Sequence, residues 1–242
     1  MAQNPSSNLL AVNLKDVHLT LTSEAGDVNI LRGINLEVVE GEAIGIVGPS
    51  GGGKSTMMMV IAGLEQASSG LVKTAGKDLN KLTEDDLALF RRDNVGIVFQ
   101  DFHLFPTMTA LENVAITLEL GENNKTETDV FKRAEDQLKL VGLGDRLTHY
   151  PSQLSGGEQQ RVAVARAFVS NPKILLADEP TGNLDGETSK VVIDLLFDLH
   201  QRVGTTMLLI SHDQTLATRC DRVVTLADGR IVEEHVGEGS RG

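Results

Sequence analysis

GPSGGGKS, at residues 48–55, is the stretch that decides the fold of this chain. It fits the pattern G-x-x-x-x-G-K-[ST], in which the backbone N–H groups of a glycine-rich loop surround phosphate oxygens. The apolar run before it, residues 43–47, predicts a strand buried on both faces. A helix is expected to follow, over residues 54–64. A flexible Gly-Ser turn is the alternative, but a loop between a buried strand and a helix is the context of a nucleotide site.

Each part of this loop has an expected role. The glycines let the backbone approach phosphates closely, and the helix N-terminus adds about half a positive charge near the anion. Lys54 is expected to reach the β- and γ-phosphates, and the Ser55 hydroxyl to bind Mg²⁺. The nucleotide-binding residues expected here are Gly48, Pro49, Ser50, Gly51, Gly52, Gly53, Lys54, Ser55 and Thr56.

A second apolar run ends in two adjacent carboxylates. ILLAD, at residues 174–178, predicts a buried strand, and Glu179 and Pro180 follow it. Ligands of open α/β sheets bind at the carboxyl edge, where such a strand ends. We therefore expect Asp178 to hold Mg²⁺ through water, and Glu179 to orient or activate the attacking water. A helix cap at Asp178 or a solvated turn is the alternative.

The third motif, LSGGEQQR at residues 154–161, predicts the start of a helix. Ser155 and Glu158 have the spacing of a capping box. That cap does not explain Gly156 and Gly157, each of which costs a helix up to about 1 kcal/mol. Glycines here would let bare backbone N–H groups approach an anion. Because the chain already holds one phosphate loop, we expect this second site to serve the nucleotide of another copy.

The remaining pattern divides the chain into a core and an insertion. Residues 9–48 and 95–99 read as strands, and a short helix is expected to begin at Thr83. Residues 101–155 carry no strand signal and match the helix-opening capping pattern at 109–112 and 126–129. Strands are then expected over 173–178, 205–211 and 223–226, and a helix over 187–203. The apolar face of that helix is expected to be Val191, Val192, Leu195, Leu196 and Leu199. We thus expect an α/β fold with a nucleotide-binding core, residues 1–100 and 161–242, and a helical subdomain, residues 101–160.

The composition of the chain excludes several classes of protein. Its 242 residues allow one large α/β domain, and 40% hydrophobic residues can fill a sizeable core. A net charge of −12 argues against non-specific binding to nucleic acid or anionic lipid. Cys220 is the single cysteine, which suits a reducing compartment. Residues 1–8 lack a signal-peptide profile, and no apolar run approaches the roughly 20 residues that cross a bilayer. We therefore expect any membrane role to depend on a partner.

Together and in this order, the motifs resemble those of ABC-type ATPase subunits, over nearly the whole chain. Three single residues, Gln100, Glu179 and His212, resemble the Q-loop glutamine, the catalytic glutamate and the switch histidine of that family. The stretches that resemble its Walker A loop, signature motif, Walker B strand and D-loop are residues 48–55, 154–159, 174–178 and 183–185.

This resemblance implies a P-loop NTPase core of the ABC type, with a mixed sheet, flanking helices, an N-terminal antiparallel β part and an inserted helical subdomain. It also implies hydrolysis of ATP with Mg²⁺. The residues it assigns to catalysis are Glu179, His212 and Gln100, and those it assigns to Mg²⁺ are Ser55, Gln100 and Asp178. The residues it assigns to nucleotide contacts across a dimer are Ser155, Gly156, Gly157, Glu158 and Asp185.

The partners are also implied by the resemblance. Two copies would enclose two Mg-ATP and drive a separate integral-membrane permease, which would dock on residues 101–115 and near 145–153. Residues 106–114 and 181–185 resemble one branch of the family, which contains the ATPases of lipoprotein release, of macrolide-type export and of the FtsE system. Within that branch, the whole chain most resembles the YbbA-like members. The implied location is peripheral, on the cytoplasmic face of the inner membrane. Neither nucleic acid nor direct membrane insertion is expected.

Three other roles stay open at this point. A soluble ABC ATPase acting on DNA or ribosomes is disfavoured by the single nucleotide-binding domain, the lack of a heptad arm and the net charge of −12. A regulator of a membrane complex that transports nothing would use the same ATPase. An importer subunit is disfavoured only by the branch resemblance.

One position departs from the family pattern. Family members stack the adenine on an aromatic residue of an N-terminal strand, where this chain has Leu21. No Phe, Tyr or Trp precedes Phe90, and the only rings nearby in sequence are His18 and His103. We therefore expect weak discrimination between nucleotide bases.

Overall fold

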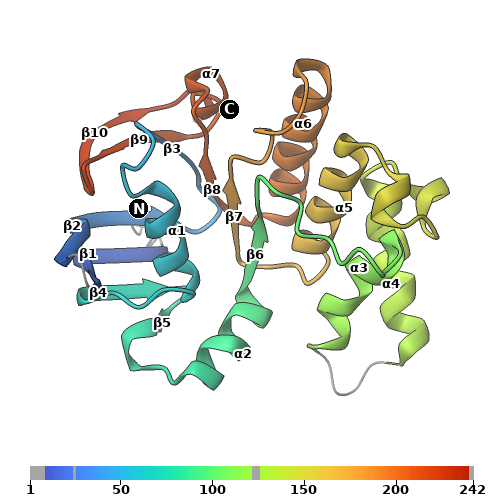
Figure 1. Cartoon of the computed structure of the whole chain (residues 1–242), viewed down its shortest axis with the longest axis horizontal. Coiled ribbons are helices and arrows are strands. Elements are labelled where there is room, and N and C mark those ends of the chain that lie inside the picture. Colours follow the sequence, from blue (N-terminus) through green and yellow to red (C-terminus); the bar gives the residue numbers. More distant parts are fainter. Residues whose placement is uncertain (1–8, 24–25, 122–125, 240–242) are drawn as a thin grey trace, which may run out of the picture.

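The computed structural model describes residues 9–23, 26–121 and 126–239. Residues 1–8, where we expect no signal peptide, lie outside the described residues. A six-stranded sheet with the order β10-β9-β3-β8-β7-β6 forms the centre (Figure 1). Its first five strands in chain order run parallel, and the last is antiparallel to its neighbour. The bounds are β3 (Ala43–Val47), β6 (Val95–Val98), β7 (Ile174–Asp178), β8 (Thr206–Ile210), β9 (Arg222–Ala227) and β10 (Arg230–Val236).

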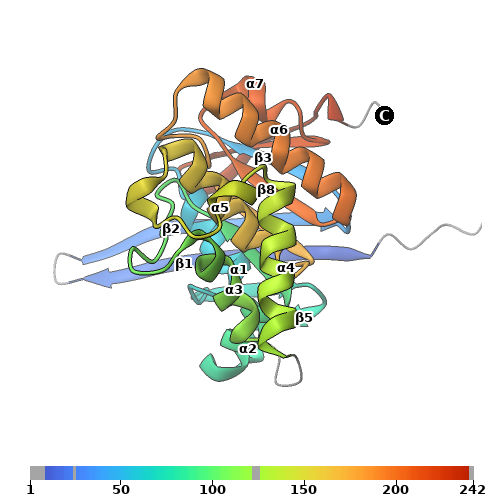
Figure 2. The ribbon, with the colours of Figure 1, turned by 90° about the vertical axis from the view of Figure 1, so that its right-hand side faces the viewer.

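A second, antiparallel sheet lies beside the first and has the order β2-β1-β4-β5. In Figure 2, the long strands of the β1–β2 hairpin run across the width of the molecule, behind the helices. Burial alternates along the second half of β2, where Leu36 and Val38 face the core, because successive side chains of a strand point to opposite faces. The bounds are β1 (Leu10–Ser23), β2 (Gly26–Val39), β4 (Ser69–Thr74) and β5 (Lys77–Asp78).

Seven α-helices and three short 3₁₀ helices are found in the described part of the chain. Of the three capping patterns that the sequence predicts, those at Thr109 and Ser155 are full capping boxes, and at Thr126 the side chain accepts from the Asp129 N–H. A further capping box opens α2 at Thr83, where the sequence predicts a helix start. None of the described helices has the length and apolar composition needed to cross a membrane. The bounds are α1 (Lys54–Ala62), α2 (Glu84–Asn94), α3 (Ala110–Glu119), α4 (Glu127–Leu140), α5 (Gly156–Phe168), α6 (Gly186–Val203), α7 (Gln214–Ala217), η1 (Leu79–Lys81), η2 (Gly144–Arg146) and η3 (Pro151–Gln153).

Two hydrophobic clusters hold these elements together. In one, α1 contacts β2 and β4 of the smaller sheet and β7 and β8 of the larger one, so this helix is packed between the sheets. In the other, α3 to α6 pack together beside the larger sheet and form the right-hand side of Figure 1. Consequently α1, which follows the glycine loop, is held rigidly by apolar contacts on both sides.

The structure adds to and corrects the sequence-based expectations. The strands β4, β5 and β10 and the helix α7 are not predicted by the patterns above. Val191 was expected on the buried face of α6 and is 52% exposed, so that expectation is wrong. The buried stripe of α6 instead includes Val192, Ile193 and Leu196, and Val191 lies about 100° around the helix from Val192. The helix α5 crosses the boundary expected at residue 160.

Candidate nucleotide-binding and hydrolysis site

The expected site residues meet because four parallel strands end at one edge of the larger sheet. Ile46 of β3 pairs with Ile210 of β8, and Ile210 pairs with Asp178 of β7. On the other side of β7, Ala177 pairs with Val98 of β6. The segments that leave these strands are the glycine loop, the segment with His212, the Glu179 turn and the segment with Gln100. Carboxyl ends of adjacent parallel strands are where open α/β sheets bind ligands.

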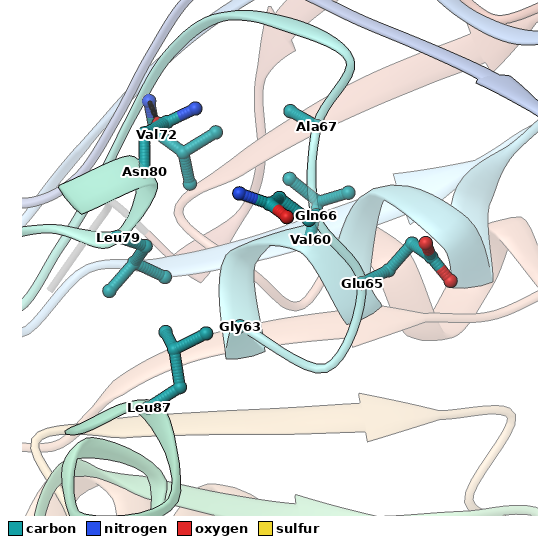
Figure 3. Close-up of a pocket in the computed structure, with 9 residues that line it drawn as sticks. All are labelled: Val60, Gly63, Glu65, Gln66, Ala67, Val72, Leu79, Asn80 and Leu87. Atoms are coloured by element: carbon teal, nitrogen blue, oxygen red, sulfur yellow. Dashed lines mark hydrogen bonds between the residues drawn. The ribbon is translucent and has the colours of Figure 1, made fainter. Parts of the chain in front are cut away.

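A cavity of about 630 Å³ lies at this edge. It is large enough for a nucleotide, since ligand sites commonly span about 300–1,000 Å³. A second pocket, between the end of α1, β4 and α2, holds only about 20 Å³ and has room for little more than a water (Figure 3). The residues lining the large cavity are Ile30, Ser50, Gly51, Gly53, Lys54, Ser55, Thr56, Gln100, Asp178, Glu179, Gly182, Ile210 and His212.

The glycine loop is shaped by close backbone contacts. A Cβ atom on Gly48 would lie 1.9 Å from the Leu226 carbonyl oxygen, so no other residue fits there. Gly53 has a φ of 97° and is the N-cap of α1, where no side chain caps the helix and no acidic residue occupies the first turn. The first N–H groups of α1 therefore lack an internal partner, and the residues that carry them, Lys54, Ser55 and Thr56, line the cavity, which suits an anion such as phosphate.

Lys54 supplies the positive charge of this site. Its Nζ donates to the carbonyl oxygens of Gly48 and Pro49, at 3.0 and 2.9 Å. In the described residues it makes no ion pair within 4.0 Å, and its direct contacts are these two carbonyl oxygens. A phosphate is the ligand that such an ammonium group prefers.

Ser55 and Asp178 provide the oxygen ligands that fit Mg²⁺. Burial raises the pKa of Asp178; the nearby Glu179 also raises it, while a hydrogen bond from Ser55 and the charge of Lys54 oppose the shift. A carboxylate that is partly desolvated and faces a second carboxylate gains from a bound cation. A hydroxyl and a carboxylate are the hard oxygen donors that Mg²⁺ selects, so these residues fit the metal.

Glu179 and His212 lie in direct contact. The Nδ1 atom of His212 is 2.5 Å from an Oε2 oxygen of Glu179, and both side chains line the cavity. Glu179 has a φ of 48°, a strained value for this residue, and its N–H donates to the Ile210 carbonyl at 3.0 Å. Backbone strain of this kind persists only where surrounding contacts enforce it. The turn thus aims the Glu179 carboxylate into the cavity.

Gln100 is held by a small polar network. Its Nε2 donates to Asn183 Oδ1 at 3.1 Å, and Asn183 Nδ2 donates to Asp101 Oδ1 at 2.8 Å. A Cβ atom on Gly182 would lie 2.8 Å from Gln100 Nε2, so a side chain at position 182 would displace the Gln100 amide from this position. With its nitrogen engaged, the amide oxygen of Gln100 is the atom that suits a hard cation.

The remaining predicted residues do not line this cavity. Ser155 caps α5 and Asp185 caps α6, whose Thr188 N–H donates to Asp185 Oδ1 at 3.0 Å. Hydrogen bonds from Ser155 lower the pKa of Glu158, which also pairs with Arg146 at 3.0 Å. The starts of α5 and α6 adjoin each other and form a separate surface of the chain.

Helix packing explains one of the two glycines in the first turn of α5. A Cβ atom on Gly157 would lie 2.2 Å from Thr188 Cγ2, whereas one on Gly156 would lie 3.5 Å from Leu184 Cδ2, an ordinary contact. We expect Gly157→Ala to lower the free energy of unfolding by about 1–3 kcal/mol through overpacking. The matched variant Gly156→Ala is expected to be neutral or to gain up to about 1 kcal/mol in helix propensity. Urea denaturation measures both, and equal effects would contradict this packing argument.

The lining of the cavity includes no large aromatic ring. Ile30 is among the lining residues, whereas no Phe, Tyr or Trp is. Leu21 is 46% exposed and pairs with Val28, which is also exposed. His18 lies 3.0 Å from Asp16, His103 packs edge-on against Phe99 at 5.1 Å, and neither histidine lines the cavity.

Sequence patterns miss two residues that organise the site. Asn183 is recognised above only as part of a stretch, yet it holds both Gln100 and Asp101. Gln160 is fully buried and donates to the carbonyl oxygens of Phe99 and Pro180, at 3.2 and 2.6 Å. The sequence gives one signal for Gln160: it is a polar residue on a helix whose following residues, Val162, Ala163 and Val164, are apolar and buried.

This fold and site define a P-loop ATPase with an inserted helical part. The family model described as ABC transporter matches residues 31–182, more than half of the chain. The chain therefore belongs to the ABC transporter family, and it is an ATP-hydrolysing subunit that uses ATP and Mg²⁺.

Its relatives cover nearly its whole length. The uncharacterised ABC transporter ATP-binding protein YbbA of Escherichia coli (strain K12) is 46% identical over 95% of this chain and 99% of its own. The lipoprotein-releasing system ATP-binding protein LolD 2 of Caulobacter vibrioides is 44% identical over 92% of this chain and 97% of its own. A dimeric structure of the ATP-binding cassette MJ0796, bound to ADP and Pi in a post-hydrolysis state, has a TM-score of 0.87 at 40% identity and covers 93% of this chain and 98% of that one. These matches confirm the predicted family and fold.

Proposed function

We propose that two copies of this chain close around two Mg-ATP and drive a separate membrane permease in export, extraction or force transmission. One observation carries the proposal. The predicted nucleotide contacts lie on two surfaces of one chain: the cavity at the sheet edge, and the starts of α5 and α6, which do not line it. Because one chain cannot bring both surfaces to one nucleotide, a second copy supplies the second surface. The dimeric MJ0796 structure supports this arrangement.

Within each site, the roles follow from the contacts. The residues that would hold the metal are Ser55, Asp178 and Gln100, and Mg²⁺ there would neutralise charge on the phosphates. Lys54 and the N–H groups at the start of α1 bind the phosphates. Glu179 accepts a proton from the attacking water, and His212 holds the carboxylate in position through the contact at 2.5 Å.

We also propose that the helical subdomain transmits the conformational change at the nucleotide site to the permease. The helical subdomain, residues 101–160, ends within α5, which continues into the core of residues 1–100 and 161–242, and Gln100 lies at the first joint between the two parts. Phe105 and Tyr150 are 47% and 44% exposed and lie within the two segments, residues 101–115 and near 145–153, that are expected to dock on the permease. Exposed aromatic side chains are common anchors in protein interfaces. This assignment places the protein on the cytoplasmic face of the inner membrane, attached through its partner.

The names of the relatives favour export or extraction over import. Several of them, at 44–48% identity, are ATP-binding proteins of lipoprotein-releasing systems. A regulator that transports nothing is the second candidate, since it would use the same site. The net charge of −12 supports partners other than nucleic acid.

A capture experiment tests the proposal. Tagged Glu179→Gln protein would be held as a closed dimer with Mg-ATP, membranes would be solubilised in mild detergent, and co-purifying proteins would be identified. Recovery of a polytopic permease is the expected result, and its periplasmic part would separate transport from force transmission. Recovery of only a soluble dimer, or of nucleic acid, would contradict the permease assignment.

Base discrimination provides a separate prediction. Aromatic stacking contributes about 1 kcal/mol, and Leu21 and Ile30 cannot provide it. We expect kcat/KM for GTP to lie within about tenfold of that for ATP, since tenfold corresponds to about 1.4 kcal/mol. Steady-state hydrolysis of the two nucleotides measures this ratio. Leu21→Tyr is the matched variant and should increase the preference for one base, whereas a much larger ATP preference in the unmodified protein would contradict the argument.

A further inference from the structure

Gln160 joins three segments of the chain that lie far apart in sequence. It is on α5, four residues after Gly156, or about 6 Å along the helix axis. Its Nε2 donates at 3.2 Å to the carbonyl of Phe99, the residue before Gln100. The same nitrogen donates at 2.6 Å to the carbonyl of Pro180, the residue after Glu179. One amide group therefore contacts the neighbours of two residues to which we assign roles in hydrolysis.

The chemistry of the site determines how the amide is oriented. Both partners are carbonyl oxygens, which only accept, so the nitrogen and not the oxygen must face them. The Oε1 oxygen is then buried without a hydrogen-bond partner in the described residues. An orphaned buried oxygen costs free energy, and such groups are uncommon in native structures. An apolar side chain of similar size would fill the same space without that cost, which indicates that the donor group itself is needed.

Pro180 belongs to a turn that needs external support. Glu179 has a φ of 48°, and Pro180 has no backbone N–H, so this turn has fewer hydrogen bonds of its own to hold it. The turn bonds to Ile210 through the Glu179 N–H and to Gly182 through the Glu179 carbonyl, both at 3.0 Å. The bond from Gln160 ties the turn to α5. A strained turn keeps its conformation only while such contacts enforce it.

We propose that Gln160 is a positioning residue that couples the start of α5 to the carboxylate of Glu179. The start of α5 is the surface that, under the proposed function on which this inference rests, contacts the nucleotide of the second copy. A shift of α5 on that contact is passed through the Gln160 amide to the Glu179 turn and to the segment before Gln100. Each site thereby hydrolyses its nucleotide efficiently only when α5 of the same chain is docked against the other site.

Arg166 forms a second set of hydrogen bonds between α5 and the segment that contains Gln100. Its guanidinium donates to the carbonyls of Phe102 and His103, at 3.0 and 2.6 Å. Gln160 and Arg166 thus contact the chain before and after Gln100. A displacement of α5 therefore carries the whole Gln100 segment with it, instead of bending it at one point.

The test compares kcat with KM in Gln160→Met, which removes the donor at similar volume. We expect kcat for ATP to fall at least about tenfold, because a displacement of about 1 Å at a catalytic group can cost a hundredfold. We expect KM to stay within about threefold, because Gln160 does not line the cavity and uniform binding is retained. ATP-dependent dimer formation of Gln160→Met combined with Glu179→Gln, followed by size-exclusion chromatography, is expected to match that of Glu179→Gln alone.

Thr205→Val is the matched control. Its hydroxyl is buried and donates to the Pro172 carbonyl at 2.9 Å, at the opposite edge of the sheet. It removes a buried hydrogen bond as Gln160→Met does, and it should leave kcat within about twofold of the unmodified protein. An equal loss of kcat in both variants would assign the effect to stability and overturn the proposal.

Other results would overturn the coupling role proposed for Gln160 or the proposed function on which it rests. Unchanged kcat in Gln160→Met, or loss of dimer formation together with kcat, would overturn the coupling role. Gln160→Asn keeps an amide but shortens its reach and should show the same split; failure of both Gln160 variants to fold would make the residue structural and overturn the proposal as well. Failure of Glu179→Gln alone to dimerise in Mg-ATP would instead refute the proposed function, whereas dimerisation of Glu179→Gln but not of the double variant would overturn only the coupling role, so the two failures are distinguishable.

Discussion

Lys54→Ala is expected to lose nucleotide binding, with a dissociation constant for ATP raised at least about tenfold and up to about a hundredfold or more. Hydrogen bonds to charged groups contribute about 1.5–3 kcal/mol, and about 1.4 kcal/mol corresponds to tenfold in affinity. Lys54 lines the cavity and contacts only carbonyls in the described residues, so its positive charge is available to a phosphate. Isothermal titration calorimetry with Mg-ATP gives the dissociation constant.

Lys132→Ala is the matched control for that change. Lys132 is an exposed lysine of α4 that pairs with Asp136 at 2.9 Å, and it does not line the cavity. Its removal should leave ATP affinity unchanged, because exposed ion pairs contribute little. If Lys54→Ala bound ATP as well as Lys132→Ala did, the assignment of Lys54 to the phosphates would be wrong.

Glu179→Gln is expected to hydrolyse ATP at least about a hundredfold more slowly and to form a stable dimer in Mg-ATP. A positioned general base contributes about 10²–10⁴-fold, and the amide cannot accept the proton. The side chain keeps its size and can still contact His212, so nucleotide binding is retained. Binding without hydrolysis holds the closed state, because ATP favours that state and ADP releases it. Phosphate release and size-exclusion chromatography measure the two effects.

Glu40→Gln is the control for the loss of a carboxylate. Glu40 is exposed in the turn before β3, at the opposite end of that strand from the glycine loop. It should hydrolyse ATP at the normal rate and show no dimer that persists in ATP. Near-normal turnover by Glu179→Gln would remove this residue from the role of base and leave His212 as the next candidate, since it lines the same cavity.

The elements that the sequence predicts well are those with local causes. The strand β3, the loop at residues 48–55 and α1 follow from an apolar run, several glycines and a helix start, all within about 20 residues of one another. The capping boxes at Thr83, Thr109 and Ser155 depend on spacings of three residues. By contrast, β4 has a weak pattern of its own, because its hydrogen bonds come from β1, a strand far earlier in the chain. The strands β5 and β10 pair with the strand just before each of them, β4 and β9, and no apolar alternation marks them in the sequence.

Contacts between helices determine which residues of α5 and α6 are packed and which are exposed, and local sequence patterns do not predict this. The sequence assigns the two glycines of α5 to an anion, whereas the structure shows that Gly157 is also required by Thr188 of α6. Val191 fits an apolar face by spacing but lies in solvent, since only packing selects which side of α6 is covered.

The sequence by itself determined the chemistry of this protein: a phosphate loop with Lys54 and Ser55, and carboxylates at Asp178 and Glu179, each carried by a short motif. The tertiary structure alone decided how they meet. The strand order β3-β8-β7-β6 brings the segments with Gln100, Glu179 and His212 to one edge beside the loop. It also places Gln160 against Phe99 and Pro180. Strand order and buried contacts depend on the free energy of packing the whole chain, and no stretch of sequence carries that information alone.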